Sequence, residues 1–126
     1  MSNLMNTLLF MALPLGVIAA DPDRVKEFFN QTVETAQKIS TAGDMRSMSL
    51  MLDKHYLQRG RYPKKENFES WMTKSFKENQ LKSLTEDHWG NAYIYQVTSK
   101  QKEYTLISLG SDGIINTKDD LKITGP

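Results

Sequence analysis

Residues 87–109 read DHWGNAYIYQVTSKQKEYTLISL, and this stretch decides the fold. From Tyr93 to Val97, aromatic or branched side chains stand at every second position, which is the period of a half-buried strand. Tyr104 to Leu109 is rich in β-branched and aromatic residues and predicts a second strand. The polar residues 98–102 between them predict a turn, so the stretch predicts an antiparallel hairpin. A hairpin is marginal alone and needs a packing partner.

The packing partner is predicted upstream, between a helix-start signal at Asp21-Pro22 and a stop at Gly60, which Tyr62-Pro63 follows. Within it, apolar residues recur at spacings of three and four, so they form one stripe on a helix. The stripe consists of Val25, Phe28, Phe29, Val33, Ala36, Met45, Met48, Met51, Leu52 and Tyr56. Gly43 interrupts the pattern, which leaves either one long helix with a soft point near residues 40–43 or two helices in line. We interpret the three methionines as flexible core filling.

A second, shorter helical pattern covers residues 64–80, with Phe68, Trp71, Met72 and Phe76 on one face. Together these elements predict an α+β fold: a long N-terminal helix packed on a small antiparallel sheet, with Trp89, Tyr93 and Tyr95 between the two layers. Residues 21–126 then form one globular domain of ordinary size.

The composition excludes several classes of function. The chain has 126 residues, 16 basic and 15 acidic, and a formal charge of +1, which speaks against a strongly electrostatic nucleic-acid binder. The absence of cysteine excludes disulfides, thiolate metal sites and cysteine nucleophiles, and two histidines cannot supply a three-histidine metal site. Neither His55 nor His88 lies in a catalytic motif, so we expect a protein that is not an enzyme and has no small-molecule substrate. Segment 44–82 has nine basic and five acidic residues, which we interpret as a solvated face.

Residues 1–20 carry no charged side chain, and three interpretations of them stay open. The segment has the apolar core and small-residue end of a cleaved signal peptide, although no Lys or Arg precedes the core. It is also near the short limit for a retained membrane anchor, and it is long enough for a buried N-terminal helix. The first two alternatives predict a periplasmic protein, or one anchored in the inner membrane and facing the periplasm.

The stretch 108–121 reads SLGSDGIINTKDDL and gathers the side chains that can carry chemistry. Three carboxylates, from Asp112, Asp119 and Asp120, lie close together with hydroxyl groups and two glycines. Ca²⁺ takes six to eight oxygen ligands that mix carboxylates with backbone carbonyls, and a glycine-containing loop can aim both at one point. The spacing differs from that of an EF-hand. The alternative is a surface turn in which aspartates accept hydrogen bonds from backbone N–H groups.

Three stretches, taken in order, resemble the major pseudopilin of type II secretion and the wider type IV pilin-like superfamily. Residues 51–63, ending in RGRYP, resemble the exit of that family's long helix; residues 87–95 resemble its DPWGNPYxY stretch; and SLGSDG followed by DDL resembles its calcium loop. Three such motifs in sequence are more specific than any one of them.

The resemblance implies a long N-terminal helix against a short antiparallel sheet and a C-terminal loop that binds Ca²⁺. By matching positions, the ligands would be the side chains of Asp112, Asp119, Asp120 and Ser111 and the main-chain carbonyl of Leu109. The implied partners are protein components of a secretion or pilus-like assembly, with an inner-membrane association through residues 1–20 if that segment is retained. The family's basic leader and the early Glu of its mature helix are not seen before Asp21, and His88 stands where the family has Pro. The alternative function is therefore a soluble periplasmic, calcium-dependent protein-binding module outside a filament.

Overall fold

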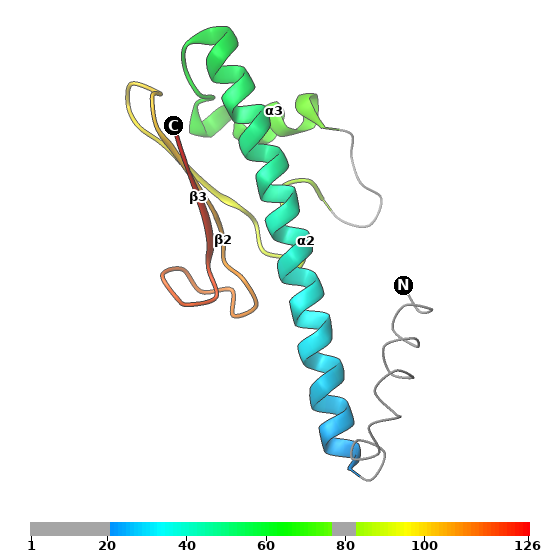
Figure 1. Ribbon diagram of the computed structural model, residues 1–126. Helices are drawn as coiled ribbons and strands as arrows, with labels where there is room; N and C mark the ends of the chain where they lie inside the picture. Colours follow the sequence, from blue (N-terminus) through cyan, green and yellow to red (C-terminus); the bar gives the residue numbers. More distant parts are fainter. Residues whose placement is uncertain (1–20, 77–82) are drawn as a thin grey trace. The chain divides into compact units, whose positions relative to one another are not determined.

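The computed structural model describes residues 21–76 and 83–126. The elements in chain order are α2 (Pro22–Arg59), the 3₁₀ turn η2 (Lys65–Asn67), α3 (Phe68–Ser75), β1 (Ile94–Val97), β2 (Tyr104–Ser108) and β3 (Leu121–Gly125) (Figure 1). The fold is α+β, as predicted. The expected signal peptide or membrane segment at residues 1–20 lies outside the described residues. Among the described helices, none combines the length and apolar character that a bilayer crossing requires.

The chain divides after Ala36 into two compact units. In the first, Asp21 caps the helix as predicted, because its Oδ1 accepts hydrogen bonds from the N–H groups of Asp23 at 3.1 Å and Arg24 at 3.4 Å. None of residues 22–36 is fully buried. The predicted apolar side chains Val25, Phe29 and Val33 are half-buried, and Phe28 is exposed.

The second unit, Gln37–Pro126, holds the core. Gly43 lies inside a continuous α2, so the long-helix alternative holds and the two-helix alternative does not. The buried positions of α2 are Thr41, Met45, Met48 and Leu52, which confirms the predicted role of the methionines at two of the three positions; Met51 is half-buried. Met45, Met48 and Leu52 pack with Tyr62 and Met72 and with side chains of the sheet, including Tyr95, Tyr104 and Leu106.

The end of α2 is fixed to the hairpin turn. Gly60 ends the helix with a φ of +73°, a conformation that only glycine adopts without strain, as the stop signal predicted. Beyond it, two hydrogen bonds join Tyr62 and Gln101: the Tyr62 N–H donates to the Gln101 carbonyl at 2.8 Å, and the Gln101 side-chain Nε2 donates to the Tyr62 carbonyl at 2.7 Å. Lys102 Nζ donates to the Gly60 carbonyl at 2.6 Å.

The second helical pattern is shorter than predicted. We expected a helix over residues 64–80, whereas α3 ends at Ser75 and Phe76 has an extended backbone, with φ −131° and ψ 150°. The reason is local packing. Phe68 stacks on Tyr95 with ring centroids 4.3 Å apart, and the extended Phe76 meets Trp71 edge to face at 6.2 Å, so its ring packs back on the helix that ends before it.

The sheet has a third strand that the sequence analysis did not predict. The order is β1-β2-β3, and both pairs are antiparallel. The predicted hairpin is β1 and β2, with Ile94 opposite Ile107 and Val97 opposite Tyr104. In β3, Ile123 lies opposite Leu106, and Gly125 lies opposite Tyr104, where any Cβ would overlap the tyrosine ring. The C-terminal residues are thereby fixed to the sheet.

Candidate metal site

The candidate ligands all lie in the connection between β2 and β3. The last residue pair of these strands is Ser108 with Leu121, so the two ends of the connection are neighbours. Leu109, Ser111 and Asp112 leave one strand, and Asp119 and Asp120 lead into the other. The third strand therefore brings together the two groups of predicted ligands, which are separated along the chain.

At Gly110 the first part of the loop lies directly against its last part. It has a φ of +68°, and a Cβ at this position would overlap the backbone carbonyl of Asp119. Any other residue would therefore push the ends of the loop apart. Gly113 also has a positive φ, of +67°, and lies beside the Asn91 side chain.

The structure brings two of the predicted ligand side chains into direct contact. Ser111 Oγ donates a hydrogen bond to Asp119 Oδ2 at 2.8 Å. The other two carboxylates bind the loop itself: Asp112 Oδ1 accepts from Ile114 N–H at 3.0 Å, and Asp120 Oδ2 accepts from Asn116 N–H at 2.6 Å. Within residues 21–76 and 83–126, no three His, Asp or Glu side chains gather in a group able to hold a metal ion.

The chemistry of the loop nevertheless fits a hard cation. Ser111, Asp112 and Asp119 are exposed, and Asp120 is half-buried, so their oxygens face solvent. The hydrogen bond from the Ile114 N–H and, to a smaller extent, one from the Thr117 hydroxyl lower the pKa of the Asp112 carboxyl and so favour its ionised form. Carboxylate, hydroxyl and backbone oxygens in a loop rich in turns are the donor set that Ca²⁺ prefers.

A buried aspartate, which the sequence analysis did not single out as a functional residue, fastens the start of this loop. Asp87 is 1% exposed, and its Oδ1 accepts from the N–H groups of Trp89 at 3.0 Å and Asn91 at 2.8 Å. Its Oδ2 accepts from Ser108 Oγ, at the end of β2, at 2.7 Å. The bond from the Trp89 N–H, two residues later, makes an Asx turn, and an Asp placed before the turn residues Gly90-Asn91 was the available signal.

Asn91 continues this connection to the loop. Its Nδ2 donates to the Gly110 carbonyl at 2.8 Å. The turn at residues 87–91 and the first turn of the candidate metal site are thus one hydrogen-bonded structure, in which the buried carboxylate of Asp87 is the common acceptor.

Both histidines form hydrogen bonds that hold a turn against α2 or its C-terminal end. His88 Nε2 donates to Asp44 Oδ2 at 2.9 Å, and its backbone N–H donates to Thr41 Oγ1 at 3.1 Å, both on α2. His55 Nδ1 donates to the Arg61 carbonyl at 2.7 Å, just beyond the end of the same helix. Tyr93 and Tyr95 are buried in the core as predicted, and Trp89 is half-buried.

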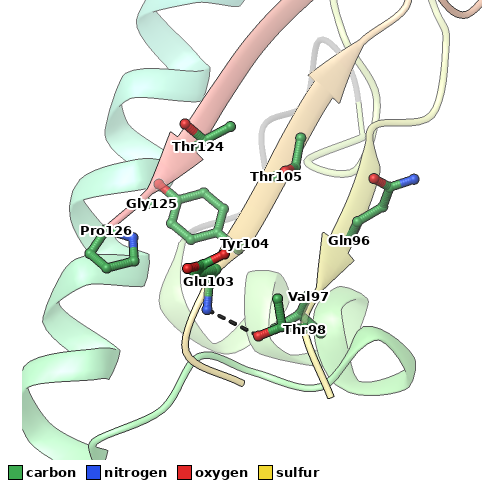
Figure 2. Close-up of a pocket in the computed structure, with 9 residues that line it drawn as sticks. All are labelled: Gln96, Val97, Thr98, Glu103, Tyr104, Thr105, Thr124, Gly125 and Pro126. Carbon is green, nitrogen blue, oxygen red and sulfur yellow. Dashed lines mark hydrogen bonds between the residues drawn. The ribbon is translucent and has the colours of Figure 1, made fainter. Parts of the chain in front are cut away.

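A shallow cavity of about 470 Å³ lies at the end of the sheet where β1 ends, β2 begins and β3 ends (Figure 2). Its walls include the Tyr104 ring and the C-terminal residues Gly125 and Pro126, and its carboxylate among the described residues is that of Glu103. The Glu103 N–H donates to Thr98 Oγ1 at 3.2 Å, which closes the hairpin turn. This cavity contains none of the candidate metal ligands.

Comparison with known proteins gives one consistent result. A family model described as type II secretion system (T2SS), protein G matches residues 28–125. The type II secretion system core protein G of Escherichia coli (strain K12) is 30% identical over 98 residues, which covers 70% of this chain and 68% of that protein. No solved structure gives a significant match.

Proposed function

Because this chain belongs to the type II secretion system protein G family, the major pseudopilins, we propose that it is a structural or assembly component of a type II secretion system or a related pilus-like system. The observation that carries this proposal is the extent of the family match, which runs from Phe28 in α2 through the sheet to Gly125. We further propose that it acts without catalysis, through contacts with other proteins of that assembly.

The location that suits this role is the periplasm or the periplasmic face of the inner membrane. Residues 1–20 would serve either as a cleaved export signal or as a retained anchor, since they carry no charged side chain. Intact-mass measurement of the mature protein distinguishes the two: a chain that begins near Asp21 supports cleavage, and a chain that retains Met1 contradicts it.

We also propose that the β2–β3 loop binds Ca²⁺. The side chains of Ser111, Asp112, Asp119 and Asp120 and the carbonyl of Leu109 would hold it. When bound, the ion would neutralise the aspartates and draw their oxygens together. The support is the exposed oxygen donor set, the contact between Ser111 and Asp119, and the close approach of the loop ends at Gly110. The role of the ion would be to clamp the C-terminal strand onto the sheet.

Deletion of the gene in its own host tests the secretion role. We expect a cargo protein of the type II system to accumulate in the periplasm, and a plasmid copy of the wild-type chain to restore its release. Asp119→Ala should restore release poorly at low calcium, whereas the neighbouring exchange Lys118→Ala should restore it fully. Normal secretion in the deletion strain, together with detergent-free release of a protein that copurifies with no secretion component, would contradict the proposal and favour the soluble binding module.

A further inference from the structure

A basic groove lies where the end of α2, the connection after it and α3 meet. The cavity has a volume of about 830 Å³, and its walls carry five cationic side chains: Lys54, Arg59, Arg61, Lys64 and Lys74. His55 and the half-buried Trp71 also line it. These residues are spread over 21 positions of sequence, in a segment whose basic surplus we expected to be a solvated face. The structure exposes all five to solvent, as expected, and gathers them around one hollow.

Among the described residues, the groove contains cations without matching anions. None of its described lining residues is Asp or Glu, and none of the five cations forms an ion pair with a described residue. Three described acidic residues of the same segment have other surroundings: Glu66 and Glu69 line a separate cavity with Tyr93 and Tyr95, and Asp53 accepts a hydrogen bond from Tyr62. In a chain with a net charge of only +1, this is a local separation of charge.

Such an arrangement attracts anions over a distance comparable to the screening length, about 8–10 Å at physiological salt. Cations on the walls of a hollow act together, because the surrounding protein focuses their field into the cavity. Nearby like charges also repel one another, and a ligand with several carboxylates relieves that repulsion. The groove is therefore suited to a polyanionic ligand rather than to a single small ion.

Trp71 adds an apolar contact to this surface. Its ring stacks on Phe68 with centroids 5.8 Å apart and meets Phe76 edge to face, so the indole is held in a fixed orientation. Lys74 lies one helical turn further along α3. A partner with an apolar or aromatic side chain between acidic ones fits this combination, because aromatic residues are frequent anchors of protein interfaces.

We propose that this basic groove binds an acidic peptide segment of a partner protein. The cations line a concavity of the size that holds small molecules or a few residues of peptide, about 300–1,000 Å³. A concave surface that also presents the Trp71 ring suits an extended peptide better than a flat bilayer or the rod of a nucleic-acid duplex. This inference is independent of the calcium proposal, since the groove contains none of the loop residues.

Fluorescence anisotropy with the full chain tests the proposal. The probe is a labelled synthetic peptide of eight Asp and Glu residues around a central Trp, and the control peptide has Asn and Gln in their place. The groove variant is Lys54→Glu/Lys64→Glu, and the matched variant outside the groove is Lys38→Glu/Lys122→Glu. Each exchange lowers the formal charge by two, so both double variants go from +1 to −3.

We expect the acidic peptide to bind the wild type, the neutral peptide not to bind, and the groove variant to lose at least about fivefold more affinity than the matched variant. Equal losses in the two variants, or no binding of the acidic peptide at low salt, would overturn the proposal. So would binding to phosphatidylglycerol vesicles that the groove variant loses while its peptide binding is unchanged. Amide chemical-shift mapping on the wild type is a check that needs no variant: peptide-induced shifts should cluster within residues 51–75, and shifts centred elsewhere refute the site.

Discussion

Replacing the buried aspartate of the 87–91 turn tests how the loop is held. In Asp87→Ala the N–H groups of Trp89 and Asn91 lose their acceptor, and so does the Ser108 hydroxyl. Each buried donor left without a partner costs about 1–3 kcal/mol. Because the hydrogen bonds of Trp89 and Asn91 are only partly buried, we expect a loss at the low end of the sum for three donors, about 3–5 kcal/mol in the free energy of unfolding. That is a large part of the 5–15 kcal/mol typical of a domain.

Two further variants separate the hydrogen bonds from the volume of the side chain. Asp87→Asn keeps one oxygen for the two N–H groups and should cost less, about 1–2 kcal/mol. Asp53→Ala removes an exposed aspartate with one long hydrogen bond, of 3.3 Å from Tyr62, and should cost less than about 1 kcal/mol. Urea unfolding at neutral pH measures all three variants. If Asp87→Ala loses no more than Asp53→Ala, Asp87 is not the anchor of the loop.

Three other outcomes follow from the structure. Gly110→Ala should destabilise the protein by about 1–3 kcal/mol, because its Cβ would overlap the Asp119 carbonyl. Gly43→Ala, where the added Cβ meets open space beside α2, should instead stabilise the protein by up to about 1 kcal/mol. Urea unfolding measures both variants, and an unchanged stability in Gly110→Ala would contradict the loop geometry. Burial and the nearby Asp53 carboxylate raise the pKa of Tyr62 to about 12, and burial also raises the pKa values of Tyr93, Tyr95 and Tyr104. Tyr62, Tyr93 and Tyr95 stay protonated in the folded chain while the unfolded chain ionises near pH 10. Their stabilisation is therefore complete below pH 10 and is lost as pH rises, by about 1.4 kcal/mol per pH unit for each of these three tyrosines, and Tyr104 adds a loss in the same direction. Urea titrations between pH 9 and 11.5 should show this fall, and a flat profile contradicts it. Ser108→Ala should cost about 1.5–3 kcal/mol by the same unfolding assay, since it removes one hydrogen bond to the buried Asp87 carboxylate, and no loss would contradict that bond.

The sequence predicts the elements whose periodicity is long enough to be distinctive. The stripe that includes Met45, Met48 and Leu52 keeps a helical spacing over several turns, and the alternation from Tyr93 to Val97 marks a strand. The third strand escapes this reasoning because its two apolar side chains, Leu121 and Ile123, are only half-buried, and pairing with β2 is what identifies them as a strand. The end of α3 depends on ring packing around Trp71, which no local pattern contains.

The sequence predicted which residues could form the candidate metal site, but not how these residues lie relative to one another. The oxygen-bearing side chains from Ser111 to Asp120 are visible in the sequence, but the neighbourhood of Ser111 and Asp119 depends on the unpredicted strand. The role of Asp87 depends on burial, and a charged residue before a turn is usually exposed. The basic groove likewise needs tertiary structure, because the cations of α2 and α3 meet only after folding.

Thermal unfolding of the wild type and Asp119→Ala, each in millimolar Ca²⁺ and in excess chelator, tests the central claim most directly. Free Ca²⁺ at a hundredfold excess over its dissociation constant stabilises a one-site protein by about 2.7 kcal/mol, which for a chain of this length raises the melting temperature by about 10 °C. The account predicts this increase for the wild type and its loss in Asp119→Ala. A wild-type melting temperature that is the same in Ca²⁺ and in chelator would contradict it.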